Sequence, residues 1–120
     1  MEKFRFLQWK VYKDARELAV CVIWLVKMIP KEYRFEIGSQ IIRSASSIVL
    51  NIAEGSAKGS DRELNRYMDI ALGSAYETLA AADMLLSCGI IDTEKFTDIH
   101  KRIIVISDQL GGFKKHLSRH

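Results

Sequence analysis

The residues best suited to chemistry lie in a line of polar side chains between positions 40 and 54. They recur at steps of three or four, which places them on one side of a helix; the line consists of Gln40, Arg43, Ser47, Asn51 and Glu54. Arg43 and Glu54 are eleven positions apart, or about 16 Å along a helix, so they cannot pair within one chain. A guanidinium fork suits a carboxylate. We therefore expect Arg43, Asn51 and Glu54 to meet partners on a neighbouring helix or subunit.

Other reactive side chains form no catalytic constellation. His116 and His120 have the i, i+4 spacing of a metal pair, but no carboxylate accompanies them. Asp69 and Glu77 are isolated candidates for polar contacts. The segment 55–60 (GSAKGS) is similar to a phosphate loop in composition, yet it follows a predicted helix, whereas a P-loop follows a strand. The sequence thus predicts a protein that is not an enzyme and that uses no cofactor or metal.

Basic residues form two groups that are candidates for nucleic-acid contact. The first surrounds the expected turn near position 58 and the second follows the last part of the chain; the members are Lys58, Arg62 and Arg66, then Lys101, Arg102, Lys114, Lys115 and Arg119. The net charge is only +3, so on one copy these groups are ordinarily a solvated face. Repeated on several copies of the chain in one assembly, they would form a stripe of positive potential able to hold phosphates. Such binding would depend on shape and charge, not on base reading.

The composition limits the kind of structure that can position these residues. A chain of 120 residues with 48% hydrophobic and 28% charged content predicts one globular domain spanning positions 1–120. One proline and seven glycines favour few, long helices. The longest apolar run, at 19–26, is far shorter than the ~20 residues that cross a bilayer. Together with the lack of a leader, this predicts a cytoplasmic protein that does not enter the membrane, with Cys21 and Cys88 as reduced core thiols.

The first helix is expected to end at Pro30, after a short N-terminal arm. Its seam alternates by three and four, as in a bundle: Val11, Ala15, Leu18, Val22, Leu25 and Ile29. Tyr12, Ile23 and Trp24 widen the apolar arc beyond what one bundle core needs. Either this helix is deeply buried or these three residues contact another subunit.

Three further helices follow from the pattern. The second covers about 35–54, with Gly38 near its start leaving room for a close neighbour. The third begins at a capping box, Ser60 with Glu63, and ends near Gly89. Asp92 caps the fourth, which we expect to fray after Leu110 because two glycines follow. Short connections make neighbours antiparallel. The expected fold is all-α, an antiparallel up-down-up-down four-helix bundle.

Several blocks of sequence carry a family resemblance. They are 11–15 (VYKDA), 17–19 (ELA), 37–45 (IGSQIIRSA), 47–48 (SI), 51–55 (NIAEG), 59–60 (GS), 70–74 (IALGS) and Glu77. With them the chain resembles the 23S rRNA intervening-sequence proteins, four-helix bundles often encoded within insertions of bacterial ribosomal RNA genes. The family usually has tryptophan where Tyr12 stands, leucine at Ile41 and proline at Val49, so the second helix is expected to be straighter here.

The resemblance implies a ring-like homopentamer. A relative, the accessory variability protein of diversity-generating retroelements, shares the bundle and the pentamer and binds reverse transcriptase and nucleic acid. Two hypotheses remain open. The protein is an oligomeric bundle that binds structured RNA or DNA through its basic surface, or it is a scaffold or adaptor for a protein partner such as a reverse transcriptase, without contact to nucleic acid.

Overall fold

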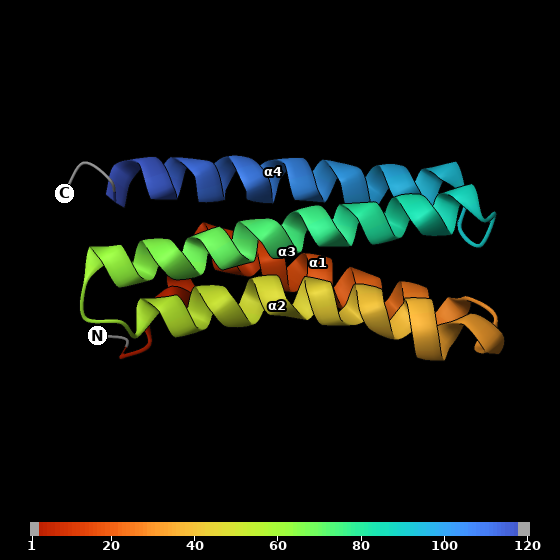
Figure 1. Cartoon of the computed structure of the whole chain (residues 1–120), viewed down its shortest axis with the longest axis horizontal. Helices are drawn as coiled ribbons and strands as arrows, with labels where there is room; N and C mark the ends of the chain where they lie inside the picture. The colour runs from red at the N-terminus through yellow and green to blue at the C-terminus, as the bar shows by residue number, and fades with distance from the viewer. Residues whose placement is uncertain (1–2, 118–120) are drawn as a thin grey trace.

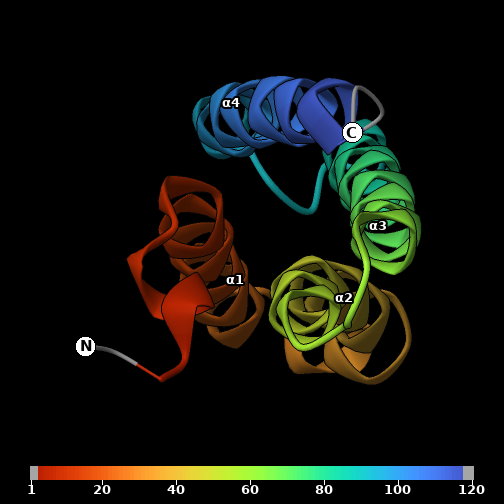
Figure 2. The ribbon, with the colours of Figure 1, turned by 90° about the vertical axis from the view of Figure 1, so that its left-hand side faces the viewer.

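The computed structural model describes residues 3–117, and within them four α-helices and no strand are present. The helices are α1 (Lys10–Met28), α2 (Ser39–Ser56), α3 (Asp61–Ser87) and α4 (Thr93–Leu117). Each runs antiparallel to the next, so that the α2–α3 turn, the first described residues and the end of α4 share one end of the bundle (Figure 1). Viewed from that end, the helices surround a common core (Figure 2). The predicted all-α, up-down-up-down four-helix bundle is confirmed.

The predicted helix boundaries depend on local hydrogen bonds that the structure contains. Ser60 Oγ accepts a hydrogen bond from the Glu63 amide at 3.2 Å, which confirms the predicted start of α3. Asp92 Oδ1 accepts one from the Lys95 amide at 2.8 Å at the start of α4. Gly89 has φ 74°, the left-handed conformation that stops α3 at low steric cost. The Glu63 carboxylate does not complete the capping box, because it lies 3.4 Å from Arg66 instead.

Two local predictions were wrong. The α-helical part of the second segment begins only at Ser39, because a 3-10 turn (Lys31–Tyr33) and a π-helical turn (Arg34–Gly38) precede it. The Arg34 guanidinium donates hydrogen bonds to the carbonyls of Ile29 (3.0 Å) and Lys27 (2.7 Å), which satisfies the end of α1. The second error is the predicted fraying after position 110. Helix α4 continues to Leu117, since that residue is buried and Phe113 packs on Trp9 with ring centroids 5.1 Å apart.

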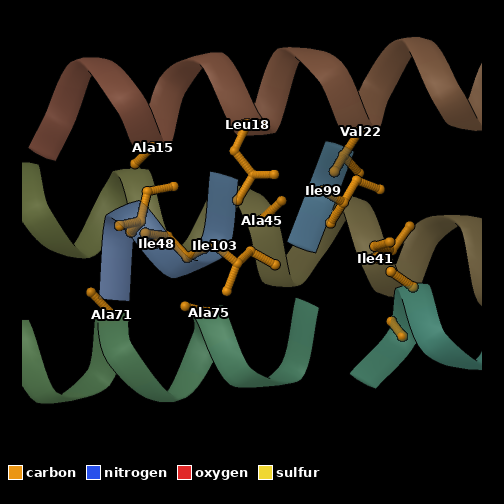
Figure 3. Packing of buried hydrophobic residues seen from close by; sticks show 14 of the residues in the cluster. Ala15, Leu18, Val22, Ile41, Ala45, Ile48, Ala71, Ala75, Ile99 and Ile103 are labelled. Atoms are coloured by element: carbon orange, nitrogen blue, oxygen red, sulfur yellow. The ribbon is translucent and has the colours of Figure 1, made fainter. Parts of the chain in front are cut away.

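The core is a single cluster of apolar side chains from all four helices (Figure 3). Every residue of the predicted α1 seam is at most 6% exposed. Glycines let the helices approach closely at two points. A Cβ on Gly38 would lie 2.9 Å from Val26 Cγ1, and one on Gly55 would lie 2.8 Å from Tyr67 Cβ. The predicted close neighbour of Gly38 is therefore present.

The cysteines depart from the sequence prediction. Cys21 is only half-buried and Cys88 is exposed, so neither is a core residue. Cys88 follows the last residue of α3 and caps its end through the backbone, where the chain leaves the bundle. Within positions 3–117, no helix combines the length and apolar character needed to cross a membrane.

Candidate functional site

Part of the predicted polar line joins α2 to α3 through a hydroxyl network. Ser74 Oγ donates a hydrogen bond to Ser47 Oγ at 2.9 Å, and Thr78 Oγ1 lies 2.9 Å from Ser44 Oγ. Asn51 Nδ2 donates to the carbonyl of Ser47 at 2.8 Å and to its hydroxyl at 3.0 Å. Asn51 therefore acts within its own helix and reaches α3 only through Ser47. The network is structural because each of these hydroxyls forms a hydrogen bond with a group on the neighbouring helix or on the preceding turn of its own helix.

The two charged members of the line behave differently. Arg43 and Glu54 are both exposed on α2, and neither makes a side-chain hydrogen bond or ion pair with any residue in 3–117. As the spacing predicts, they do not pair with each other. Glu77 on α3 is likewise exposed. A partner for Arg43 or Glu54 on a neighbouring helix of the same chain is thus not observed, which leaves a second subunit as the predicted source.

The first basic group converges at the α2–α3 turn. Lys58 Nζ lies 5.0 Å from the centroid of the Tyr67 ring, and the Arg66 guanidinium carbon lies 4.8 Å from the same centroid. Arg62 is exposed and forms no ion pair within the described chain. Arg66 forms an exposed ion pair with Glu63 at 3.4 Å, and such a pair contributes little to stability. We call Lys58, Arg62 and Arg66 the turn cluster; beside it lies a hollow of about 360 Å³ that Arg62 and Arg66 help to line.

More basic side chains lie at this end of the bundle. Arg5, in the 3-10 turn Arg5–Gln8, donates a hydrogen bond to the carbonyl of Ser56 at 3.2 Å. Lys115 and His116, in the last turn of α4, are exposed at the same end (Figure 1). The fold therefore gathers the turn cluster, the N-terminal arm and the end of α4, which are far apart in sequence.

The second basic group is not one surface. Arg102 Nε lies 3.2 Å from the Asp98 carboxylate, and Lys114 forms an ion pair with Asp69 on α3. Both charges are thereby balanced locally. Lys101 is exposed in the first half of α4, which lies away from the turn cluster (Figure 1). Arg119 and His120 lie outside the described residues, so the predicted pairing of His120 with His116 is outside them too.

A groove of about 650 Å³ runs between α1 and α4. Trp24 and Met28 line it and are 60% and 71% exposed. Cys21 also lines it, and its thiol donates a weak hydrogen bond to Asp98 at 3.4 Å. Burial, with the adjacent Asp98 carboxylate, raises the pKa of the Cys21 thiol, so this cysteine is not an activated nucleophile.

The other two predicted contact residues of α1 differ from Trp24. Ile23 is 37% exposed and remains available to a partner. Tyr12 is half-buried, and its ring packs edge-on against Phe6 with centroids 4.9 Å apart. The Arg16 guanidinium lies 5.8 Å from the same tyrosine ring. Tyr12 thus packs largely within its own chain.

Asp14 links α1 to α4 through a hydrogen bond with Gln109. Its Oδ2 accepts hydrogen bonds from Lys10 Nζ at 2.6 Å and from Gln109 Nε2 at 2.7 Å. Partial burial acts to raise the pKa of Asp14, but the hydrogen bonds from Lys10 and Gln109 and the charges of Lys10 and Arg102 outweigh it and lower the pKa. This carboxylate is therefore a structural anion.

No arrangement of reacting groups emerges elsewhere in the described residues. Positions 3–117 contain no group of three or more His, Cys, Asp or Glu side chains that could hold a metal. His100 packs against Phe96 with ring centroids 5.5 Å apart.

Sequence reasoning missed three features of the site. Tyr67, which Lys58 and Arg66 flank, carried no periodic signal. The balancing of Arg102 by Asp98 was detectable, because i, i+4 pairs face each other on a helix. The pairing of Lys114 with Asp69 was not, since it depends on how α3 and α4 are aligned.

Known proteins place this chain in a family. Residues 8–112 match the family described as 23S rRNA-intervening sequence protein. A crystal structure of a protein with unknown function from the S23 ribosomal protein family of Bacteroides thetaiotaomicron superposes with a TM-score of 0.82 at 28% sequence identity. The match covers 88% of this chain and 98% of the other. No curated protein matches the chain. The chain belongs to the family of 23S rRNA-intervening sequence proteins.

Proposed function

We propose that this protein is a non-enzymatic, homo-oligomeric bundle that binds structured RNA or DNA through the turn cluster. The observation that carries the proposal is the position of Lys58, Arg62 and Arg66 at one end of the bundle. Of the predicted basic residues, Arg62 has no carboxylate partner in the described chain, whereas Arg66, Arg102 and Lys114 do. Phosphate oxygens are natural partners for such exposed guanidinium groups.

The cluster is suited to a sugar-phosphate backbone and not to bases. Its cations lie on the α2–α3 turn and the first turns of α3, a placement that suits contact with phosphates, which fix position without reading sequence. The Tyr67 ring, which could stack on a base, is half-buried and has Lys58 and Arg66 close to it. We therefore propose recognition of charge and shape, as is usual for double-helical RNA.

The oligomer is proposed to form through α1. Trp24 and Met28 expose apolar surface beside the α1–α4 groove, and Ile23 extends it. Exposed apolar residues that gather in one place mark interaction surfaces. A ring, proposed here as a pentamer, would repeat the turn cluster around one rim and multiply its potential.

A filter-binding series with a double-helical RNA at increasing salt tests this function. Binding that weakens steeply with salt is expected, because each phosphate contact releases counterions. Binding that is absent at low salt, or that does not change with salt, would refute the proposal.

The α1–α4 groove favours a second function. Its exposed Trp24 and Met28 could seat another protein, such as a reverse transcriptase, and make the bundle an adaptor. A pull-down from lysate that is unchanged by nuclease would support the adaptor. Recovery of RNA alone would exclude it.

A further inference from the structure

The outward face of α2 has charges of opposite sign on either side of an exposed leucine. Arg43, Leu50 and Glu54 are separated by seven and four positions. At about 100° per residue, these three side chains leave the helix within roughly 40° of one another. They form a straight stripe, which we call the α2 stripe.

Nothing in the described chain covers the α2 stripe. Leu50 is 65% exposed, and the charges of Arg43 and Glu54 are not balanced by any described residue. Ser46 and Ala57 lie beside the stripe and are small, so another helix could approach closely. In contrast, five basic residues elsewhere on the described bundle each have a carboxylate beside them: Lys10, Arg16, Arg66, Arg102 and Lys114.

The order of the three residues is self-complementary. The midpoint between Arg43 and Glu54 lies one and a half positions from Leu50, or about 2 Å along the helix. A two-fold axis through that point reverses the helix and brings each arginine to the level of the other copy's glutamate. We infer that α2 packs antiparallel against α2 of a second copy of this chain, with Arg43 facing Glu54 of the partner subunit and the two Leu50 side chains at the centre.

Self-complementarity favours a second copy over an unrelated partner. An isologous contact requires that each residue pair occurs twice, related by the axis. One stripe with a cation at one end and an anion at the other meets that requirement without any further residue.

This contact goes beyond the proposed function. A two-fold contact does not generate a ring by itself, and it uses neither the α1–α4 groove nor the turn cluster. It joins a protomer of one assembly to a protomer of another. Its success or failure is therefore independent of RNA binding and of the contact through Trp24.

A disulfide cross-link tests the contact directly. A two-fold contact near position 50 places this residue beside its own copy, so Leu50→Cys should form a covalent dimer rapidly on mild oxidation. The change is made together with Cys88→Ser, which removes the exposed native thiol. The unaltered chain, with Cys88 present, supplies the rate at which an exposed thiol dimerises by random collision. Leu50→Cys should exceed that rate at least tenfold; an equal rate would overturn the inference.

Charge reversal then tests whether Arg43 pairs with Glu54 of the second copy, and it distinguishes loss of that pair from a general effect on folding. Arg43→Glu or Glu54→Arg alone sets like charges against each other twice, and each should slow cross-linking through Leu50→Cys about tenfold at low salt. A one-to-one mixture of the two variants restores both opposite-charge pairs, so the fast rate should return in the mixed dimer. Asp83→Arg, an exposed reversal on α3, should leave the rate unchanged. A mixture that stays as slow as its components would overturn the inference.

Discussion

Thr78 of α3 and Ser44 of α2 meet in the core, where the two hydroxyl oxygens lie 2.9 Å apart and the residues are 0% and 1% exposed. Thr78 Oγ1 also lies 2.8 Å from the carbonyl oxygen of Ser74, one turn earlier. Polar groups buried to this extent are costly unless they are paired. The pair therefore fixes how α2 is aligned against α3, which is the alignment that brings Lys58 close to Tyr67 and Arg66.

Replacing Thr78 by valine should destabilise the bundle with little change in shape. The change leaves the buried Ser44 hydroxyl with one partner fewer, and we expect the free energy of unfolding to fall by about 1–3 kcal/mol. Urea unfolding at a fixed protein concentration measures it, since oligomers gain stability with concentration. Thr93→Val, at an exposed position on α4, should change the free energy by less than about 0.5 kcal/mol. Equal effects of the two substitutions would contradict the role of the hydroxyl pair.

Two glycine-to-alanine substitutions should act in opposite directions. A Cβ on Gly55 would lie 2.8 Å from Tyr67 Cβ, so Gly55→Ala forces α2 and α3 apart and should cost about 1–3 kcal/mol. A Cβ on Gly111 meets nothing within 4 Å, and Gly111→Ala should stabilise α4 by about 0.5–1 kcal/mol. Thermal unfolding of both variants gives the comparison. A destabilised Gly111→Ala chain would contradict the continuous helix through that position.

The stability that Asp14 provides should depend on pH in one direction. Because its pKa is lowered in the folded chain, the carboxylate stabilises the fold at pH values above its ordinary pKa of about 3.9. This contribution is lost as the pH falls through the lowered pKa. Asp14→Asn should therefore have a lower melting temperature than the unaltered chain at pH 7. Near pH 3 the melting temperatures of the two chains should approach each other. Glu77→Gln, at an exposed carboxylate, is the control. A gap in melting temperature that is the same at both pH values would show that the charge has no role.

Subunit association should depend on Trp24. The unaltered protein should have a molar mass in solution that is a multiple of 13.7 kDa, five times that value for a pentamer. Trp24→Ser removes exposed apolar area beside the α1–α4 groove and should lower this mass. Ile23→Ser should act in the same way and more weakly. Tyr76→Ser removes an aromatic that is 68% exposed on α3, and it should leave the mass unchanged. Light scattering on a sizing column distinguishes these results. An unchanged mass for both Trp24→Ser and Ile23→Ser would exclude α1 as the contact.

Much of the fold could be predicted from the sequence because its signals are local. The α1 seam, the Ser60 and Asp92 caps and the left-handed Gly89 each depend on spacing or on one residue's conformational preference. The prediction failed where packing overrides propensity, as at Gly111, where Phe113 and Leu117 hold the helix against the core. The exposure of Cys88 also escaped prediction, because burial at a helix end depends on where the chain leaves the bundle.

The site was less predictable, since it depends on which helices are neighbours. Spacing alone established that Arg43 and Glu54 do not pair with each other. It could not show that Lys58 and Arg66 would flank one ring, or that Asp69 would balance Lys114 across two helices. Charge at a bundle end is a property of the assembled fold.

The salt dependence of RNA binding tests the central claim most directly. We propose comparing the unaltered protein with the double variant Arg62→Ser/Arg66→Ser in filter binding to a double-helical RNA. The variant Lys31→Ser/Lys95→Ser loses the same charge at the other end of the bundle and serves as the control. Each lost phosphate contact lowers the slope of log affinity against log salt by about 0.9. The account predicts a slope smaller by about two and weaker binding for Arg62→Ser/Arg66→Ser alone; affinities and slopes that match those of the unaltered protein would contradict it.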